Sequence, residues 1–494
     1  TNLTYIMINL KLIFKYNNKD KQTYKIVKNL VLFVNKIIKK NLIFQNLLSN
    51  LGLIFDVPKE ILEKRSNQLL FRSYEFEKKK FNKNFNFIYI FWDFIILFFF
   101  LIFLLFNNFI YIKRKIRKYD IICDNIHTVS DAETHQNFSK KFKSVLFFSY
   151  SKLNFFKKKI KVVNVNKELL NHIDFQFKNR LFLFFFIFKV LFYSLYHRIN
   201  LFFIFKFIIY DFIKYEKLYS QHTGKYYFNY RFYDTNILQN YLFKKRGGLK
   251  TSCFQKNICI LSLSCFVYSD IFFTLGNNQG KICKELGGEI KIIKPVGSLF
   301  MENKWFNNNQ NISNISDVDI LILGINAPWP RGCINSDFHN SYYKKFIPWI
   351  KKISTEFPDK NILYKHHNNF PGDSREAKLL SNSNIKIIID DKNLNSYGWA
   401  FKSKLILSFA STMVVELLGN NKEAYFIDPG GINDQWFYGI KQLNKYKVND
   451  YKSLKNLVLK KNYKSNGVPP KKRNYYCLKS INTIEKISKF LKQS

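Results

Sequence analysis

Three short clusters of polar residues in the last part of the chain have the types and spacing to bind a phosphate. The first is Lys365, His366 and His367, at the end of the apolar run ILYK. A lysine ammonium and a protonated imidazole make charge-assisted hydrogen bonds to phosphate oxygens, and perturbed histidines gather at active sites. Two adjacent histidines after a predicted strand therefore favour a functional role over a structural one.

The second cluster is Ser411, Thr412 and Glu416 in SFASTMVVE, and the third is Asp428 in AYFIDPGG. Ser411 and Thr412 stand where a helix is predicted to begin, and a helix N-terminus offers unpaired N–H groups and partial positive charge to an anion. Ordinary N-capping is the alternative for these hydroxyls. The glycine pair after Asp428 permits close backbone approach to a ligand, although an ordinary turn fits equally well.

The segments around these clusters alternate between strand and helix patterns. From Asp319 onward, helical patterns and polar loops separate the apolar runs ILILG, ILYK, IKIIID, LILS and AYFID. This rhythm is typical of a parallel α/β sheet, whose ligands bind at the carboxyl ends of the strands. Similar runs predict an earlier α/β unit, with strands near 119–125, 143–149, 258–264, 270–276 and 290–297.

The motifs KHHN at 365–368 and FAST at 409–412, with the following VVELLGNNKEAYFIDPGG, resemble a known group of enzymes. They are similar to the donor-binding half of inverting, two-Rossmann-domain glycosyltransferases of bacterial surface-carbohydrate pathways. Within that group the likeness is to His-Pro/Ser-Thr-motif sialyltransferases and CDP-glycerol glycerophosphotransferases. Asn368 stands where those families have proline, which leaves open whether His366 or His367 is the counterpart. The likeness covers residues 250–436.

The resemblance implies displacement at the donor carbon, with electrostatic stabilisation of the leaving phosphate. The donor-binding residues would then be Lys365, His366, His367, Ser411, Thr412, Glu416 and Asp428. No cofactor and no metal are expected, because no D-x-D element follows a strand.

A general base would come from the first α/β domain. Four residues there follow apolar segments, namely Asp124, Glu133, His135 and His222. Each could titrate usefully, and we rank Glu133 and His222 first. The competing interpretation is that all four are solvated loop residues.

The N-terminal part has the patterns of membrane association. Residues 1–85 are Lys-rich with an amphipathic helical pattern, and 87–106 contain one charge, Asp93, in a run long enough to cross a bilayer. Spanning, interfacial and buried locations stay open for that run. Charges interrupt the apolar block 181–213, which favours a membrane-facing helix pair or an aromatic core over spanning.

The length of 494 residues predicts more than one domain. We expect an α/β protein with two Rossmann-like domains facing a cleft, after a helical, membrane-associating N-terminal region. The predicted divisions are a basic helical region at 1–85, an acceptor domain at 86–295 with apolar segments at 87–112 and 181–213, a donor domain at 296–474, and a C-terminal helix at 475–494 that packs back on the acceptor domain.

The sequence therefore predicts a metal-independent glycosyltransferase. Its partners would be a nucleotide-activated sugar donor, a polysaccharide or lipid-linked acceptor, and an anionic membrane surface at the cytoplasmic face of the cell membrane. The alternative is a non-catalytic, membrane-associated assembly protein with a relic Rossmann-like domain. Nucleic acid is not expected, because the net charge of +44 is spread along the chain without a localised basic footprint.

Overall fold

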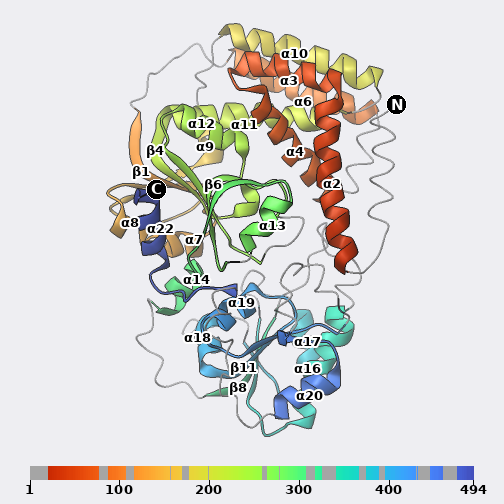
Figure 1. The fold of residues 1–494 in the computed structure, drawn as a ribbon, viewed down its shortest axis with the longest axis vertical. Coiled ribbons are helices and arrows are strands. Elements are labelled where there is room, and N and C mark those ends of the chain that lie inside the picture. Colours follow the sequence, from red (N-terminus) through yellow and green to blue (C-terminus); the bar gives the residue numbers. More distant parts are fainter. Residues whose placement is uncertain are drawn as a thin grey trace. The chain divides into compact units, whose positions relative to one another are not determined.

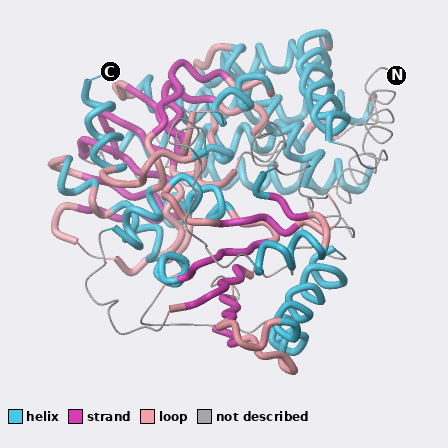
Figure 2. Tube along the Cα trace, turned by 60° about the horizontal axis from the view of Figure 1, so that its bottom comes forward, coloured by secondary structure: helices cyan, strands magenta, loops and turns pink. Residues whose placement is uncertain are grey.

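The chain folds into two compact units. The first contains residues 1–254, 262–272 and 283–292, and the second contains 255–261, 273–282 and 293–494. A computed structural model describes residues 20–76, 87–106, 116–155, 157–169, 177–197, 200–258, 264–277, 279–306, 317–324, 341–366, 374–388, 395–429, 431, 445–459 and 476–493. Figures 1 and 2 show strands interleaved with helices in both parts of the chain.

The first sheet has seven strands in the order β3-β2-β1-β4-β5-β6-β7. The pairs from β3 to β5 are parallel, and Ile122 of β1 lies opposite Leu146 of β2 and Tyr227 of β4. The chain adds β2 and β3 on one side of β1 and then returns to its other side, so the strand order reverses between β1 and β4. The strands are β1 (Arg117–Asp124), β2 (Val145–Ser149), β3 (Ile160–Asn164), β4 (His222–Asn229), β5 (Lys250–Phe254), β6 (Tyr268–Thr274) and β7 (Glu289–Pro295).

The second sheet has six strands in the order β10-β9-β8-β11-β12-β13, all paired in parallel. The six strands follow the same order as the first six positions of the first sheet, and here the strand order reverses between β8 and β11. The strands are β8 (Val318–Leu323), β9 (Ile362–Lys365), β10 (Lys386–Ile388), β11 (Ser403–Ser408), β12 (Ala424–Ile427) and β13 (Lys447–Val448). Two parallel doubly wound sheets confirm the predicted pair of Rossmann-like folds.

Helices follow the strands as the apolar periodicity predicts. In the first sheet they are α7 (Val129–His135), α8 (Phe138–Lys141), α9 (Val165–Leu169), α12 (Ile237–Lys245) and α13 (Gln279–Glu285), with the 3₁₀ turn η2 (Phe232–Asp234). Later helices are α14 (Leu299–Met301), α16 (Ile347–Glu356), α17 (Ser374–Leu380), α18 (Ser396–Lys402), α19 (Thr412–Gly419), α20 (Tyr451–Leu459) and α22 (Thr483–Gln493), with π-helical turns η3 (Glu302–Phe306) and η4 (Tyr342–Phe346).

The C-terminal helix α22 packs inside the second compact unit. Its Phe490 lies 6.2 Å from the ring of Phe273 on β6 and beneath Lys294 of β7. The backbone N–H of Ile484 donates to Glu302 Oε2 at 3.0 Å. The helix therefore contacts the ends of β6 and β7 and also η3, which precedes the second sheet.

The chain before β1 forms a helical layer, which confirms the predicted helical N-terminal region. Its helices are α2 (Asp20–Lys40), α3 (Leu42–Phe55), α4 (Lys59–Phe76) and α6 (Phe87–Phe106), and they pack with α10 (Phe177–Tyr196) and α11 (Phe202–Gln221). Exposed Trp92 and Phe99 show that the wholly buried location is wrong for 87–106. In the block 181–213, α11 is largely buried whereas α10 exposes aromatic side chains.

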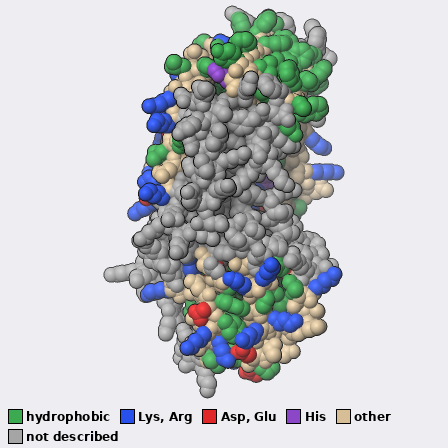
Figure 3. Space-filling view, turned by 90° about the vertical axis from the view of Figure 1, so that its right-hand side faces the viewer, with side chains coloured by type: hydrophobic (Ala, Val, Ile, Leu, Met, Phe, Trp, Pro, Cys, Tyr) green, Lys and Arg blue, Asp and Glu red, His purple; other side chains and the backbone are tan. Residues whose placement is uncertain are grey.

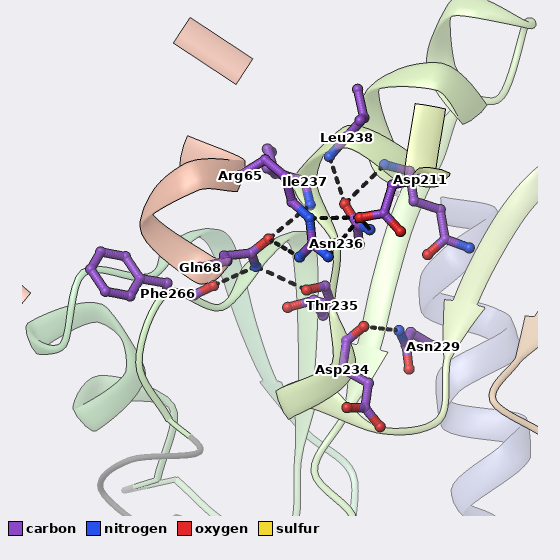
Figure 4. Close-up of polar contacts among 11 residues, drawn as sticks. Arg65, Gln68, Asp211, Asn229, Asp234, Thr235, Asn236, Ile237, Leu238 and Phe266 are labelled. Carbon is purple, nitrogen blue, oxygen red and sulfur yellow. Dashed lines mark hydrogen bonds and ion pairs between the residues drawn. The ribbon is translucent and has the colours of Figure 1, made fainter. Parts of the chain in front are cut away.

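A buried polar network fastens α4 to α11 and to two connecting segments of the first unit (Figure 4). Arg65 Nε donates to Asp211 Oδ2 of α11 at 2.9 Å. The Gln68 amide donates to the carbonyls of Thr235 and Phe266 at 2.9 and 2.8 Å. Because a buried charge or amide is costly unless it is paired, these contacts fix the orientation of the helical layer on the first unit.

Candidate functional site

The three predicted clusters lie at one edge of the second sheet. Lys365 ends β9, Ser408 ends β11 and Ile427 ends β12, and these strands run parallel in the order β9-β8-β11-β12. Their carboxyl ends therefore share an edge, and the strand order reverses between β8 and β11. The structure thus brings the clusters to the place where an open α/β sheet binds its ligand.

His366 is held by a carboxylate directly after β9. Its Nδ1 lies 2.7 Å from Glu376 Oε2, and its backbone N–H donates to the Ile388 carbonyl at 2.8 Å. Both side chains are buried. The other carboxylate oxygen of Glu376 accepts a hydrogen bond from Tyr342 Oη at 2.6 Å. This pairing fixes the imidazole orientation, which a group acting on a ligand requires.

Glu376 is a site residue that the sequence prediction missed. It comes from α17, ten positions after His366, across residues 367–373, which lie outside the described part of the chain. His367, the second predicted histidine, falls in that stretch. A carboxylate ten positions from the histidine matches no spacing rule that a sequence motif supplies. An acidic residue in the first turn of the next predicted helix was the available signal.

Lys365 and Gly324 complete the ends of β9 and β8. Lys365 is buried, with its Nζ 3.5 Å from the His366 carbonyl oxygen. Gly324 donates its backbone N–H to the Lys365 carbonyl at 3.0 Å, and a Cβ on this glycine would lie 2.5 Å from Tyr364 Oη. A larger residue would therefore displace the ring of Tyr364, whose hydroxyl group lies 2.6 Å from that of Tyr342.

The second cluster begins α19 three residues after β11. Ser411 is the N-cap, and its hydroxyl accepts from the Met413 N–H at 3.2 Å. Thr412 Oγ1 accepts from the Ile258 N–H at 3.2 Å. The N-capping interpretation therefore describes the Ser411 hydroxyl. The first turn of α19 still places the positive end of a helix at the carboxyl edge of β11.

Glu416 supports α19 from inside the unit. Its two carboxylate oxygens accept from Ser298 Oγ at 2.5 Å and from Tyr397 Oη at 2.7 Å. Burial raises the pKa of this carboxyl group, and the two donors oppose that rise. Ser298 also caps α14, and Tyr397 belongs to α18. These hydrogen bonds connect three helices, and a role of Glu416 in binding the donor stays a prediction.

Asp428 follows β12 at the start of a tight turn. It is buried, its N–H donates to the Val448 carbonyl at 2.8 Å, and its carbonyl accepts from the Gly431 N–H at 3.2 Å. Gly431 has a φ of 63°, in the left-handed region that favours glycine. The predicted turn is present, while Gly430 lies outside the described residues.

The base candidates of the first unit lie at different edges of its sheet. His222 begins β4 opposite Arg117, so it is at the amino edge, buried against Tyr119 and Phe148. Glu133 is half-buried on α7, which follows the carboxyl end of β1. The role of either residue as a base stays a prediction, and Glu133 lies on the ligand-binding side.

Asp124 and His135 are also buried, so the solvated-loop interpretation is wrong for them and for His222. Asp124 accepts from Tyr227 Oη at 2.6 Å and from Gln239 Nε2 at 2.8 Å. His135 Nδ1 lies 2.6 Å from the Asp131 carbonyl oxygen, and its ring packs on Tyr230. These contacts make both residues parts of the core beneath the carboxyl edge.

A polar group that the sequence prediction passed over bridges the strand reversal of the first sheet. Asn125, after β1, donates from Nδ2 to Asn229 Oδ1 at the end of β4 at 2.9 Å. His127 Nε2 lies 3.4 Å from Asn125 Oδ1, and its ring stacks on Tyr150. Burial, aided by Arg231, lowers the pKa of His127 and favours a neutral imidazole. The polar residues DNIH at 124–127, which directly follow the apolar run YDIIC at 119–123, could have indicated this group in the sequence.

Comparison with solved structures finds folds similar to this chain. A Staphylococcus aureus MnaA–UDP co-structure shares 12% identity over 76% of this chain and 96% of its own, with a TM-score of 0.45. UDP-GlcNAc 2-epimerase from Neisseria meningitidis bound to UDP-GlcNAc shares 11% over 76% and 100%, with a TM-score of 0.44. The wall teichoic acid polymerase TagF shares 10% over 76% and 88%, with a TM-score of 0.43.

No family model matches the sequence, and no curated protein sequence matches it. The likeness to the solved structures concerns the fold.

Proposed function

We propose that this chain transfers a sugar, or a related phosphorylated group, from a nucleotide-activated donor to a polysaccharide or lipid-linked acceptor. The observation that carries the proposal is the buried His366–Glu376 pair at the end of β9, with the start of α19 on the other side of β8. Strands two positions apart are separated by about 10 Å, a span that a nucleotide-sugar diphosphate can bridge.

The proposed chemistry is displacement at the donor carbon. The acceptor hydroxyl oxygen bonds to that carbon while the bond from the carbon to the phosphate oxygen breaks, and the nucleotide leaves with the electron pair. Lys365, His366 and the N–H groups of α19 stabilise the negative charge that grows on the leaving phosphate. The acceptor proton passes to a base, for which Glu133 and His222 remain our candidates. The reaction as proposed requires neither metal nor cofactor.

The proposal is tested by thermal stabilisation with CMP-, CDP-, UDP- and GDP-linked donors. We expect one donor class to raise the unfolding temperature of the wild type, with chelator present. The shift should fall by more than half in His366→Ala and in Ser411→Ala, because each removes part of the phosphate site. Ser381→Ala should keep the full shift, because Ser381 follows α17 and precedes the amino end of β10.

The outcomes separate the proposal from its alternative. Stabilisation by no nucleotide donor would overturn the proposal and favour the non-catalytic assembly protein. Stabilisation that both site substitutions leave unchanged would show that a donor binds elsewhere.

A further inference from the structure

Helices α6 and α10 form an antiparallel pair in the helical layer of the first unit. Phe94 and Phe98 of α6 meet Phe188 and Phe184 of α10, with ring centroids 5.3 and 5.2 Å apart. Figure 1 shows both helices in the layer that contains α3. The inner sides of the pair are therefore packed, and their outer sides are available for contact.

Both helices expose large apolar side chains at the same spacing. The positions are i, i+4, i+7, i+11 and i+15, which lie on one side of an α-helix. The side chains are between 41% and 73% exposed. On α6 they are Ile88, Trp92, Ile95, Phe99 and Phe103. On α10 they are Leu181, Phe185, Phe188, Phe192 and Tyr196. We call these ten side chains the apolar face.

Hydrophobic side chains gather over these helices in the space-filling view (Figure 3, top). A folded monomer rarely exposes a contiguous apolar surface of this kind, and such surfaces mark contacts with proteins or membranes. The apolar face is therefore a binding surface, and the charges around it identify the partner.

The acidic side chain of the pair, which an anionic lipid surface would repel, is paired with other residues of the protein. Asp93, the acidic residue of α6, accepts hydrogen bonds from Lys206 Nζ at 2.5 Å and from Asn200 Nδ2 at 2.8 Å. Lys206 belongs to α11, and Asn200 lies just before that helix. The sequence of α10 contains no Asp or Glu. No described residue of either helix therefore presents an unpaired carboxylate to the partner.

Exposed lysines lie on α10 and at the end of α2. Lys189 lies exposed on α10, and Lys36, Lys39 and Lys40 are exposed at the end of α2, where the chain enters α3. The sequence on both sides of α6 is also basic, with KKK at 78–80 and KRK at 113–115. Lysines are attracted to an anionic lipid surface, whereas two copies of one basic surface repel each other.

We propose that the apolar face of α6 and α10 lies in the plane of an anionic lipid bilayer as an interfacial helix pair, with neither helix crossing the membrane. Among the described residues, Asn179–Tyr196 is the helix long and apolar enough to span. It is packed lengthwise against α6, and Phe100 of α6 packs on Tyr210 of α11. Helices that expose one apolar side while the other is packed on protein are suited to the interface. The inference is independent of the transfer reaction.

Flotation of the full chain with vesicles tests the surface. We expect binding to vesicles of phosphatidylglycerol and phosphatidylcholine, and weaker binding to phosphatidylcholine alone. Phe99→Ser with Phe185→Ser and Phe192→Ser should weaken partitioning by roughly a hundredfold, because three half-exposed rings no longer enter the lipid. The matched control, Leu249→Ser with Leu379→Ser and Leu459→Ser, removes exposed leucines elsewhere and should leave partitioning unchanged.

Several results would overturn the proposal. They are no flotation of the wild type, equal partitioning of the two triple variants, or a dimer that forms without lipid and disappears in the aromatic variant. The last result would assign the face to a second copy of the chain.

The depth of α6 in the bilayer is tested by the quenching of tryptophan fluorescence with brominated lipids. The variants used keep an apolar side chain at each changed position. The chain contains six tryptophans, so Trp92→Phe provides the background signal of the others, and the quenching that this variant loses reports position 92. Phe99→Trp in the Trp92→Phe background then reports position 99, about two turns further along α6. An in-plane helix predicts equal depth for both, near the headgroups. A markedly deeper signal at position 99 would show that α6 crosses the bilayer.

Discussion

At the scale of single residues, two buried carboxylates hold different parts of the second unit in place. Glu376 holds His366 at the carboxyl edge of the second sheet, whereas Glu416 holds α14 and α18 against α19. The sequence motif placed Glu416 at the donor and gave no sign of Glu376. The spacing in a motif shows which residues occur together in the sequence. Which group a carboxylate contacts depends on how the surrounding elements pack in the fold.

Glu376→Gln should lower the free energy of unfolding by about 1.5–3 kcal/mol, since the buried carboxylate accepts hydrogen bonds from His366 and Tyr342. Donor affinity should fall with it, because the imidazole loses its fixed orientation. Urea unfolding measures the first effect and titration with the stabilising donor the second. Glu356→Gln, at a surface ion pair, should change neither. Equal behaviour of the two variants would contradict the role of Glu376.

Glu416 should make stability depend on pH. Its pKa is raised above the ordinary value of 4.5 by burial, so the folded chain binds this proton more tightly than the unfolded chain does. The resulting stabilisation is present at low pH and is lost as pH rises from 4.5 through the folded pKa. Glu416→Gln removes this titration. Urea unfolding between about pH 4 and pH 8 should show the wild type losing stability relative to the variant; parallel curves would refute the assignment.

At the scale of elements, strands with regular apolar runs were predictable and strands with internal polar contacts were not. The predictions near β1, β2, β6 and β7, and from β8 to β12, are confirmed. The sequence HTGKYYFN of β4 was not recognised, because the Tyr227 hydroxyl and Asn229 amide find partners only in the folded sheet. The strand predicted at 258–264 falls mostly outside the described residues, and β5 lies before it.

The start of α19 offers a test that separates helix capping from anion binding. Ser411→Ala should cost about 1 kcal/mol of stability through the lost cap. Ser411→Asp keeps a favourable cap and should retain the wild-type stability, yet its carboxylate should repel the donor phosphate and lower affinity at least roughly tenfold. Chemical denaturation and donor titration of both variants provide the measurement. An aspartate variant that binds the donor normally would exclude this helix end from the phosphate site.

At the scale of the whole molecule, the same strand order occurs in both sheets and places polar residues at both carboxyl edges. Asn125 and Asn229 meet at the strand reversal of the first sheet, and β8 and β11 adjoin at that of the second. The alternation of elements made this architecture predictable. The sequence left open whether α6 and α10 face lipid or the protein core, because an apolar run has the same composition in either place.

The central claim is that a nucleotide-activated donor binds at the carboxyl edge of the second sheet. Hydrogen–deuterium exchange with the stabilising donor tests it most directly. The account predicts slower exchange in peptides that cover 361–366 and 408–416, and loss of that protection in His366→Ala. Protection confined to other parts of the chain, or protection that survives His366→Ala undiminished, would contradict it.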